Sequence, residues 1–149
     1  MAGKFSTDVL LKRLFKTTSI SRFLNRYGDN MKRAPLNIYI NQICEAKGIA
    51  PEHIIRKSGM SRSYGYQIFS GIRKPSRDKV LQLAVSFEMD YDETQELLRT
   101  ARKSPLYPKV ERDAAIIYAL HKKLNIAEVQ ALLNELALPL LGEDDRCEN

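Results

Sequence analysis

The segment from Ile54 to Arg77 contains cationic side chains but no aspartate or glutamate. Its cations are Arg56, Lys57, Arg62, Arg73, Lys74 and Arg77. Guanidinium and ammonium groups bind phosphate oxygens, and a carboxylate among them would repel the same anion. The pattern therefore favours a surface that meets a polyanion over the common alternative of a solvated charged face.

The charge is divided unevenly along the chain. Residues 1–77 carry a net charge of +11 and residues 78–149 one of −5, within a total of +6 for 149 residues. A basic half of this size favours a polyanionic partner. We expect the acidic C-terminal part to serve dimerisation or to contact a protein partner.

Side chains that could support catalysis are sparse. His53 and His121 stand apart from any Cys, Asp or Glu set with metal-ligand spacing, and no nucleophile, phosphate-loop or dinucleotide motif occurs. Cys44 and Cys147 match no metal motif either, so we expect free thiols in a reducing cytosol. No apolar run approaches the roughly 18–20 residues of a membrane span. The sequence predicts a cytoplasmic protein that is not an enzyme, uses no metal or cofactor and has no membrane partner.

The pattern of apolar residues and of capping residues predicts helices throughout, because strand alternation and Asn-Gly hairpin turns are missing. Glycines mark the expected helix ends and serines the expected helix starts. These are Gly28, Gly48 and Gly59 for the ends, and Ser19, Ser61 and Ser76 for the starts. We expect an all-α protein with four parts: a basic helical extension (1–34), a bundle of about five helices (35–104), a helical hairpin (109–142) and an acidic tail (143–149).

Part of the chain repeats itself. Residues 77–98 and 112–133 align without a gap at an offset of 35 residues and share seven identities, Arg77/Arg112 and Asp78/Asp113 among them. A period near 35 residues is the size of one helical hairpin. We therefore expect the second hairpin to copy the first and to pack on it, with chance similarity between amphipathic helices as the alternative.

Residues 36–100 combine several recognisable features. Three short helices are expected between Leu36 and Phe69, with the turn Gly59-Met60-Ser61 before the third and the run SGIRKPS (70–76) after it. An apolar fourth helix and an acidic fifth follow. In these features the segment resembles the Cro/C1-type (XRE family) helix-turn-helix domain of bacterial and phage regulators. The resemblance implies that the third helix, 62–69, enters the major groove of DNA while the second helix and the following loop lie along the phosphates.

The resemblance also assigns contact residues by their positions in the motif. Those expected to contact base edges are Arg62, Ser63, Tyr66 and Gln67. Those expected to contact phosphates are Ser61, Arg73, Lys74 and Arg77, together with the N-terminus of the second helix. An arginine can pair with guanine and a glutamine with adenine, each through two hydrogen bonds.

Two positions depart from the family pattern. A small residue usually stands on the second helix opposite a bulky one on the third, but here those positions hold Ile55 and Gly65. Exchanging the sizes roughly keeps the volume, so Gly65 is expected to leave the space into which Ile55 packs. The alternative is that Gly65 kinks or breaks the third helix. In addition, Phe69 replaces a frequent glutamate, so one internal ion pair of the family is not expected.

Two interpretations stay open for residues 1–33. They could reach along a DNA duplex as a basic arm, or their apolar side chains (Leu10, Leu14, Phe23, Leu24) could pack on the bundle or on a second subunit, which we favour.

The whole sequence predicts a DNA-binding transcriptional regulator of bacterial or phage type that binds double-stranded DNA as a homodimer. The rival hypothesis is a protein-interaction module of the same fold that no longer reads DNA: an adaptor, an antitoxin-like partner or an inhibitor that meets an acidic protein surface.

Overall fold

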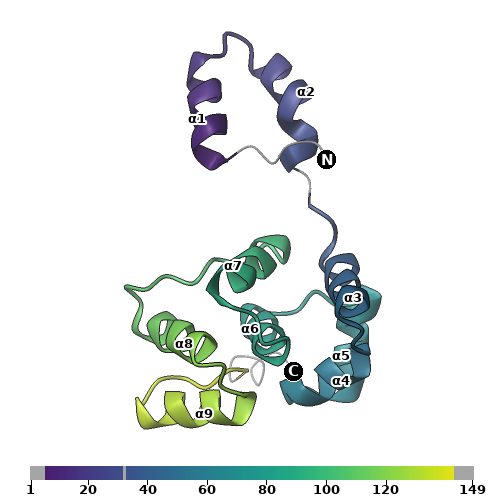
Figure 1. Ribbon diagram of the computed structural model, residues 1–149, viewed down its shortest axis with the longest axis vertical. Helices are drawn as coiled ribbons and strands as arrows, with labels where there is room; N and C mark the ends of the chain where they lie inside the picture. The colour runs from purple at the N-terminus through teal and green to yellow at the C-terminus, as the bar shows by residue number, and fades with distance from the viewer. Residues whose placement is uncertain (1–5, 32, 143–149) are drawn as a thin grey trace. The chain divides into compact units, whose positions relative to one another are not determined.

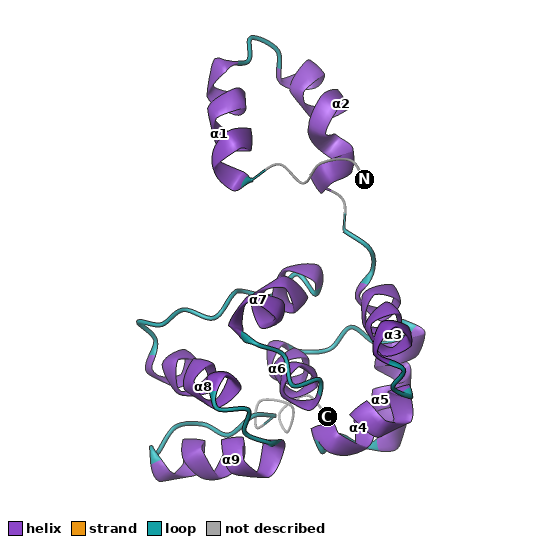
Figure 2. Cartoon of the chain, in the orientation of Figure 1, coloured by secondary structure: helices purple, strands orange, loops and turns teal. Residues whose placement is uncertain are grey.

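A computed structural model describes residues 6–31 and 33–142 of the chain. Within these residues the protein contains nine α-helices and no strand, so the prediction of an all-α protein is confirmed (Figures 1 and 2). The expected acidic tail and Cys147 lie outside the described residues, whereas Cys44 is a buried free thiol whose pKa is raised by its burial. The chain divides into two compact units, Met1–Ala34 and Pro35–Asn149, which are described separately.

The N-terminal unit is a hairpin of two helices, α1 (Thr7–Lys16) and α2 (Ile20–Met31). Ser19 caps α2 as expected, since its hydroxyl accepts a hydrogen bond from the Arg22 amide at 3.3 Å. The expected end of this helix at Gly28 is wrong. Gly28 does not adopt a positive φ, and the helix continues through it to Met31. A glycine stops a helix only where the backbone turns left-handed.

The larger unit contains the other seven helices. They are α3 (Leu36–Lys47), α4 (Pro51–Ser58), α5 (Arg62–Ser70), α6 (Arg77–Ser86), α7 (Tyr91–Thr100), α8 (Glu111–His121) and α9 (Ile126–Glu135).

Local chemistry sets the boundaries of the first helices in this unit. Gly48 and Gly59 end α3 and α4 in the left-handed conformation, with φ of 66° and 78°. Ser61 and Ser76 cap α5 and α6, each accepting a hydrogen bond from the amide three residues on. These four boundaries agree with the prediction.

Helix α6 forms the centre of the larger unit. Every residue from Val80 to Phe87 is buried, and the helix packs on α4, α7 and α9. Figure 1 shows α6 between α3, α4 and α5 on one side and α8 and α9 on the other. Six of these eight residues are apolar, and the two polar ones, Gln82 and Ser86, donate hydrogen bonds to backbone carbonyl groups, so the helix can be enclosed on all sides. The core therefore runs continuously from the first three helices of the unit to the C-terminal hairpin.

The two C-terminal hairpins, α6–α7 and α8–α9, correspond residue by residue at the offset of 35. Both second helices begin with a capping box, made by Asp90 with Glu93 in α7 and by Asn125 with Glu128 in α9. The side chain of Gln95 bonds to both backbone polar groups of Leu106, and that of Gln130 does the same at Leu141. Chance similarity between amphipathic helices would not reproduce these backbone contacts.

The hairpins are also joined reciprocally by two ion pairs. Arg77 of the first pairs with Asp113 of the second through two bonds of 3.1 and 3.0 Å. Arg112 of the second pairs with Asp78 of the first through two bonds of 2.9 Å. Each arginine also donates to two carbonyl groups that follow its own hairpin. The arrangement resembles a two-fold symmetric dimer formed within one chain.

Candidate nucleic-acid interface

The close packing of α4 and α5 depends on Gly65. A β-carbon at this position would lie 2.7 Å from Cγ1 of Ile55 and closer still to Cγ2. The expectation that Ile55 packs into the space left by Gly65 is therefore confirmed. The alternative of a broken helix is wrong, because α5 runs from Arg62 to Ser70 and the Gly65 amide donates to the Ser61 carbonyl at 2.9 Å.

Helix α5 has one face in the core and one facing solvent. Ile68 and Phe69 are buried together with Gly65, which fixes the rotation of the helix. The expected base-contact residues lie away from the core: Arg62, Ser63 and Tyr66 are exposed and Gln67 is half-buried. The structure therefore brings these four side chains to one outward-facing part of α5.

Arg62 is largely exposed but has neighbours of its own. Its guanidinium lies 3.4 Å from the Glu52 carboxylate on α4 and 5.6 Å from the centre of the Tyr66 ring. The pKa of Arg62 is raised by its hydrogen bond to Tyr66 and by the charge of Glu52. Since the arginine side chain is 74% exposed, water screens the pair with Glu52. A partner that offered a better anion could therefore displace Glu52.

Gln67 is oriented by Arg73 from the loop that follows α5. The Arg73 Nε donates to the Gln67 Oε1 at 2.8 Å, and its backbone amide donates to the Gln67 carbonyl at 3.1 Å. The Arg73 guanidinium also lies 4.9 Å from the centre of the Tyr64 ring. These contacts place a cation beside the outer face of α5 and hold the glutamine amide in one orientation.

Lys79 adds a cation that the sequence analysis did not consider. Its ammonium lies 5.4 Å from the centre of the Tyr64 ring, so Lys79 from α6 and Arg73 from the loop meet at one aromatic side chain. This cation–π contact joins residues that are 15 positions apart in the sequence, and the only available signal was the position of Lys79 in the first turn of a capped helix. Of the residues expected to contact phosphates, Ser61 caps α5 through its hydroxyl and Lys74 is exposed.

Unlike the exposed cations, Arg77 forms hydrogen bonds and an ion pair within the protein. Its side chain is 24% exposed and its guanidinium is held by Asp113 and by the carbonyl groups of Ser104 and Pro105. The expected phosphate site at the N-terminus of α4 also has a feature that opposes an anion, because Pro51 lacks an amide hydrogen and Glu52 stands in the first turn. For these reasons neither Arg77 nor the N-terminus of α4 is counted with the exposed cations of α4, α5 and the following loop.

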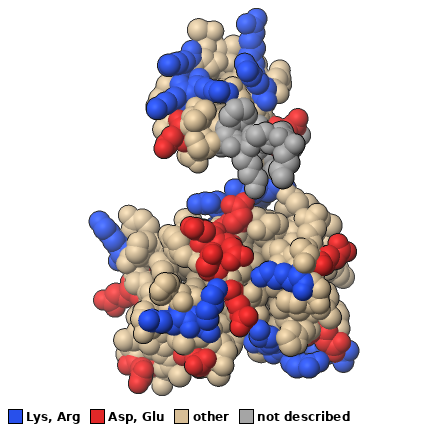
Figure 3. Space-filling view, in the orientation of Figure 1, with Lys and Arg blue, Asp and Glu red and all other residues tan. Residues whose placement is uncertain are grey.

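Positive side chains gather at the part of the larger unit formed by α4 and α5. Figure 3 shows Lys and Arg in this region at the lower right, with some Asp or Glu beside them, and Asp and Glu near α7. The exposed cations from the two helices and the following loop are Arg56, Lys57, Arg62, Arg73 and Lys74. We call this set, with Ser63, Tyr66 and Gln67, the α5 face.

No family model, curated protein or solved structure matches the chain. Within the described residues no group of three or more His, Cys, Asp or Glu side chains is placed to hold a metal ion. A search of the same residues finds no helix with the length and apolar character needed to cross a bilayer.

Proposed function

We propose that the larger unit contains a Cro/C1-like helix-turn-helix domain and binds double-stranded DNA by placing α5 in the major groove. The observation that carries the proposal is the α5 face. It combines outward polar side chains on one short helix with cations on the flanking helix and loop. This combination suits DNA, because base edges require hydrogen-bonding side chains and phosphates require positive charge around them.

The residues take different roles in this proposal. Arg62 and Gln67 pair with guanine and adenine, and Ser63 and Tyr66 contact neighbouring base edges or a thymine methyl group. Arg73 and Lys74 neutralise phosphates, assisted by the Ser61 hydroxyl at the start of α5. The ion pair between Arg62 and Glu52 opens on binding. The protein acts as a transcriptional regulator that binds its site as a homodimer, since one helix reads only a few base pairs.

One observation favours the rival, a protein-interaction module. Glu52 is a carboxylate 3.4 Å from Arg62 on the surface that would meet DNA, and a carboxylate repels phosphates. A protein partner that carries both charges would tolerate it. The two hypotheses differ in whether the protein binds DNA at low salt.

The first test is a fluorescence-anisotropy titration of a random-sequence duplex between about 50 and 200 mM salt. The wild type is compared with Arg62→Ala/Arg73→Ala and with a control, Lys109→Ala/Lys122→Ala, which removes the same charge near α8. We expect the first variant to bind more weakly and with a log–log salt slope lower by about 1, because Arg73 neutralises one phosphate, which contributes about 0.9, whereas Arg62 contacts a base. The control should bind like the wild type.

Absence of binding even at the lowest salt would reject the DNA-binding proposal and favour the search for a protein partner. Equal weakening by both variants would show that binding depends on overall charge and not on the α5 face.

A further inference from the structure

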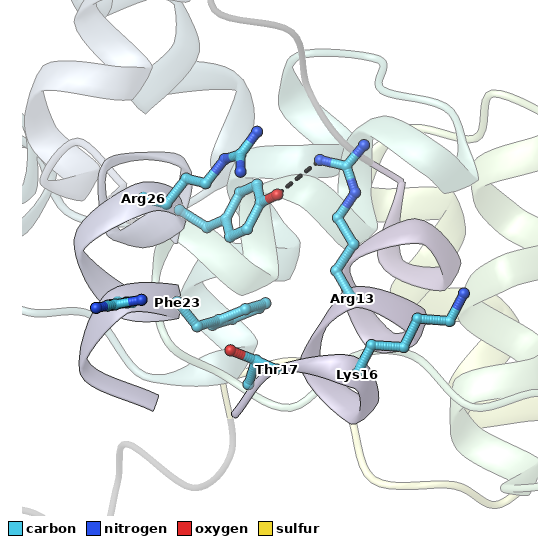
Figure 4. A pocket seen from close by; sticks show the side chains of 7 residues that line it. Arg13, Lys16, Thr17, Phe23 and Arg26 are labelled. Carbon is cyan, nitrogen blue, oxygen red and sulfur yellow. Dashed lines mark hydrogen bonds between the residues drawn. The ribbon is translucent and has the colours of Figure 1, made fainter. Parts of the chain in front are cut away.

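The N-terminal unit contains a cavity that the proposed function does not use. It lies between α1 and α2 and has a volume of about 380 Å³. Four cations and two rings line it: Arg13, Lys16, Arg22, Arg26, Phe23 and Tyr27 (Figure 4). The volume falls in the roughly 300–1,000 Å³ range of small-molecule sites.

Two of the cations are held in place by the same tyrosine. Arg13 donates a hydrogen bond of 2.7 Å to the Tyr27 hydroxyl, and the guanidinium groups of Arg13 and Arg26 lie 5.6 and 5.5 Å from the centre of the Tyr27 ring. Figure 4 shows the side chains of Arg13 and Arg26 extending toward the same part of the cavity. The ring is buried and packs on Phe23 with a centroid distance of 4.9 Å. The guanidinium groups of Arg13 and Arg26 are therefore oriented before any ligand arrives.

Three of the four cations around the cavity form no ion pair within the described part of the chain. Among residues 6–31 and 33–142, no aspartate or glutamate lines the cavity, and none forms an ion pair with Lys16, Arg22 or Arg26. Cations gathered around one space repel each other, and a bound anion relieves that repulsion. Guanidinium groups in particular match phosphate, because they donate two parallel hydrogen bonds to its oxygens.

We propose that this cavity binds the phosphate group of a small molecule, with Arg13, Arg22 and Arg26 as hydrogen-bond donors and Lys16 as an additional charge. The three cations without such an ion pair, next to the Arg13 guanidinium held by Tyr27, favour a dianion such as a phosphate monoester over a single carboxylate. A cavity between two helices can hold a small molecule. The backbone of a DNA duplex, in contrast, is contacted by side chains that project from a protein surface. The cavity therefore favours a small molecule. The site is independent of the α5 face.

The test uses the full-length protein labelled with ¹⁵N, in which arginine Nε–Hε signals are followed at constant ionic strength. Inorganic phosphate, pyrophosphate and adenosine monophosphate are titrated separately, with chloride as the reference anion. We expect saturable shifts confined to Arg13, Arg22 and Arg26. The variant Arg22→Gln/Arg26→Gln removes two exposed cations of the cavity, and Lys12→Gln/Lys109→Gln removes the same charge elsewhere. The affinity should fall about tenfold or more in the first variant and less than about twofold in the second.

Three results would overturn the proposal. The first is non-saturating shifts spread over arginines of both units. The second is an equal loss of affinity in both variants. In the third, a short DNA duplex shifts the cavity arginines while the small phosphates do not, which would assign the cavity to the nucleic-acid backbone. Since the wild-type titrations need no variant to fold and no DNA to bind, failure here leaves the DNA proposal for the α5 face unaffected.

Discussion

At the scale of single residues, Gly65 shows how a residue unfavourable for local structure can be required by packing. A glycine inside a helix costs about 1 kcal/mol relative to alanine. Here its missing β-carbon lets α5 approach Ile55 on α4. The same contact fixes which side of α5 faces the core and therefore which side chains face outward. The residue thus controls both stability and the geometry of the α5 face.

We predict that Gly65→Ala destabilises the protein by roughly 1–3 kcal/mol, because overpacking against Ile55 outweighs the gain in helix propensity. In an Ile55→Ala background the same change should become neutral or stabilising, since the space is then available. Urea unfolding followed by circular dichroism measures both. Gly28→Ala is the control, because no atom lies within 4 Å of a β-carbon there. A loss from Gly65→Ala that is the same in both backgrounds would contradict the contact.

At the scale of elements, the reciprocal ion pairs connect the two C-terminal hairpins at their most buried charges. The side chain of Asp78 is 6% exposed. Burial opposes its ionisation, but the hydrogen bonds from Arg112 and from the Gly142 amide, and the charges of Arg112 and Arg77, outweigh this effect. The pKa of Asp78 is therefore lowered. A carboxylate with a lowered pKa stabilises the folded state at neutral pH and loses that contribution as the pH falls.

We predict that Asp78→Asn costs roughly 3–5 kcal/mol at pH 7, because the partly buried Arg112 loses the carboxylate that accepts two of its hydrogen bonds. The stabilisation by Asp78 is complete above its unfolded pKa of about 3.9 and disappears as the pH falls through the lower folded value. Between about pH 5 and pH 2 the wild type should therefore lose more stability than the variant. Denaturant titrations across this range measure the difference, and parallel pH profiles would contradict it.

At the scale of the whole molecule, the larger unit does not end with the fifth of its helices. The sequence predicts a bundle at 35–104 and a separate hairpin at 109–142. In the structure α9 packs on α6, and the core includes Ile116, Val129 and Leu133. The second hairpin therefore completes the core that the first leaves open.

We predict that a chain truncated after Ser104 is unfolded or much less stable than the full chain. Truncation exposes the apolar side of α6 and removes the partners of Arg77 and Asp78 together. Thermal unfolding and backbone hydrogen exchange distinguish the two chains. An equally stable and cooperative truncated chain would show that the second hairpin is an appendage.

Much of this protein could be predicted from the sequence because it depends on near neighbours. Ser61 and Ser76 cap helices through amides three residues away, and Gly48 and Gly59 end helices through their own φ. The space at Gly65 was also predictable, since the two residues that meet there occupy matched positions of a recognisable motif. Gly28 failed as a signal because a glycine permits a left-handed turn without imposing one.

The sequence by itself determined the helices, most of their boundaries, the repeat and the charge of the α5 face. Only the tertiary structure decided which charged side chains pair with one another inside the protein. The repeat places an arginine and an aspartate at the start of both hairpins, and nothing local tells whether each arginine pairs within its own copy or with the other. The packing of the two hairpins decided this, and Arg77 pairs with Asp113 of the other hairpin. It likewise placed Arg73 and Lys79 at Tyr64 and brought Arg13 of α1 to Tyr27 of α2, because these contacts depend on how the elements pack and not on the spacing of residues along them.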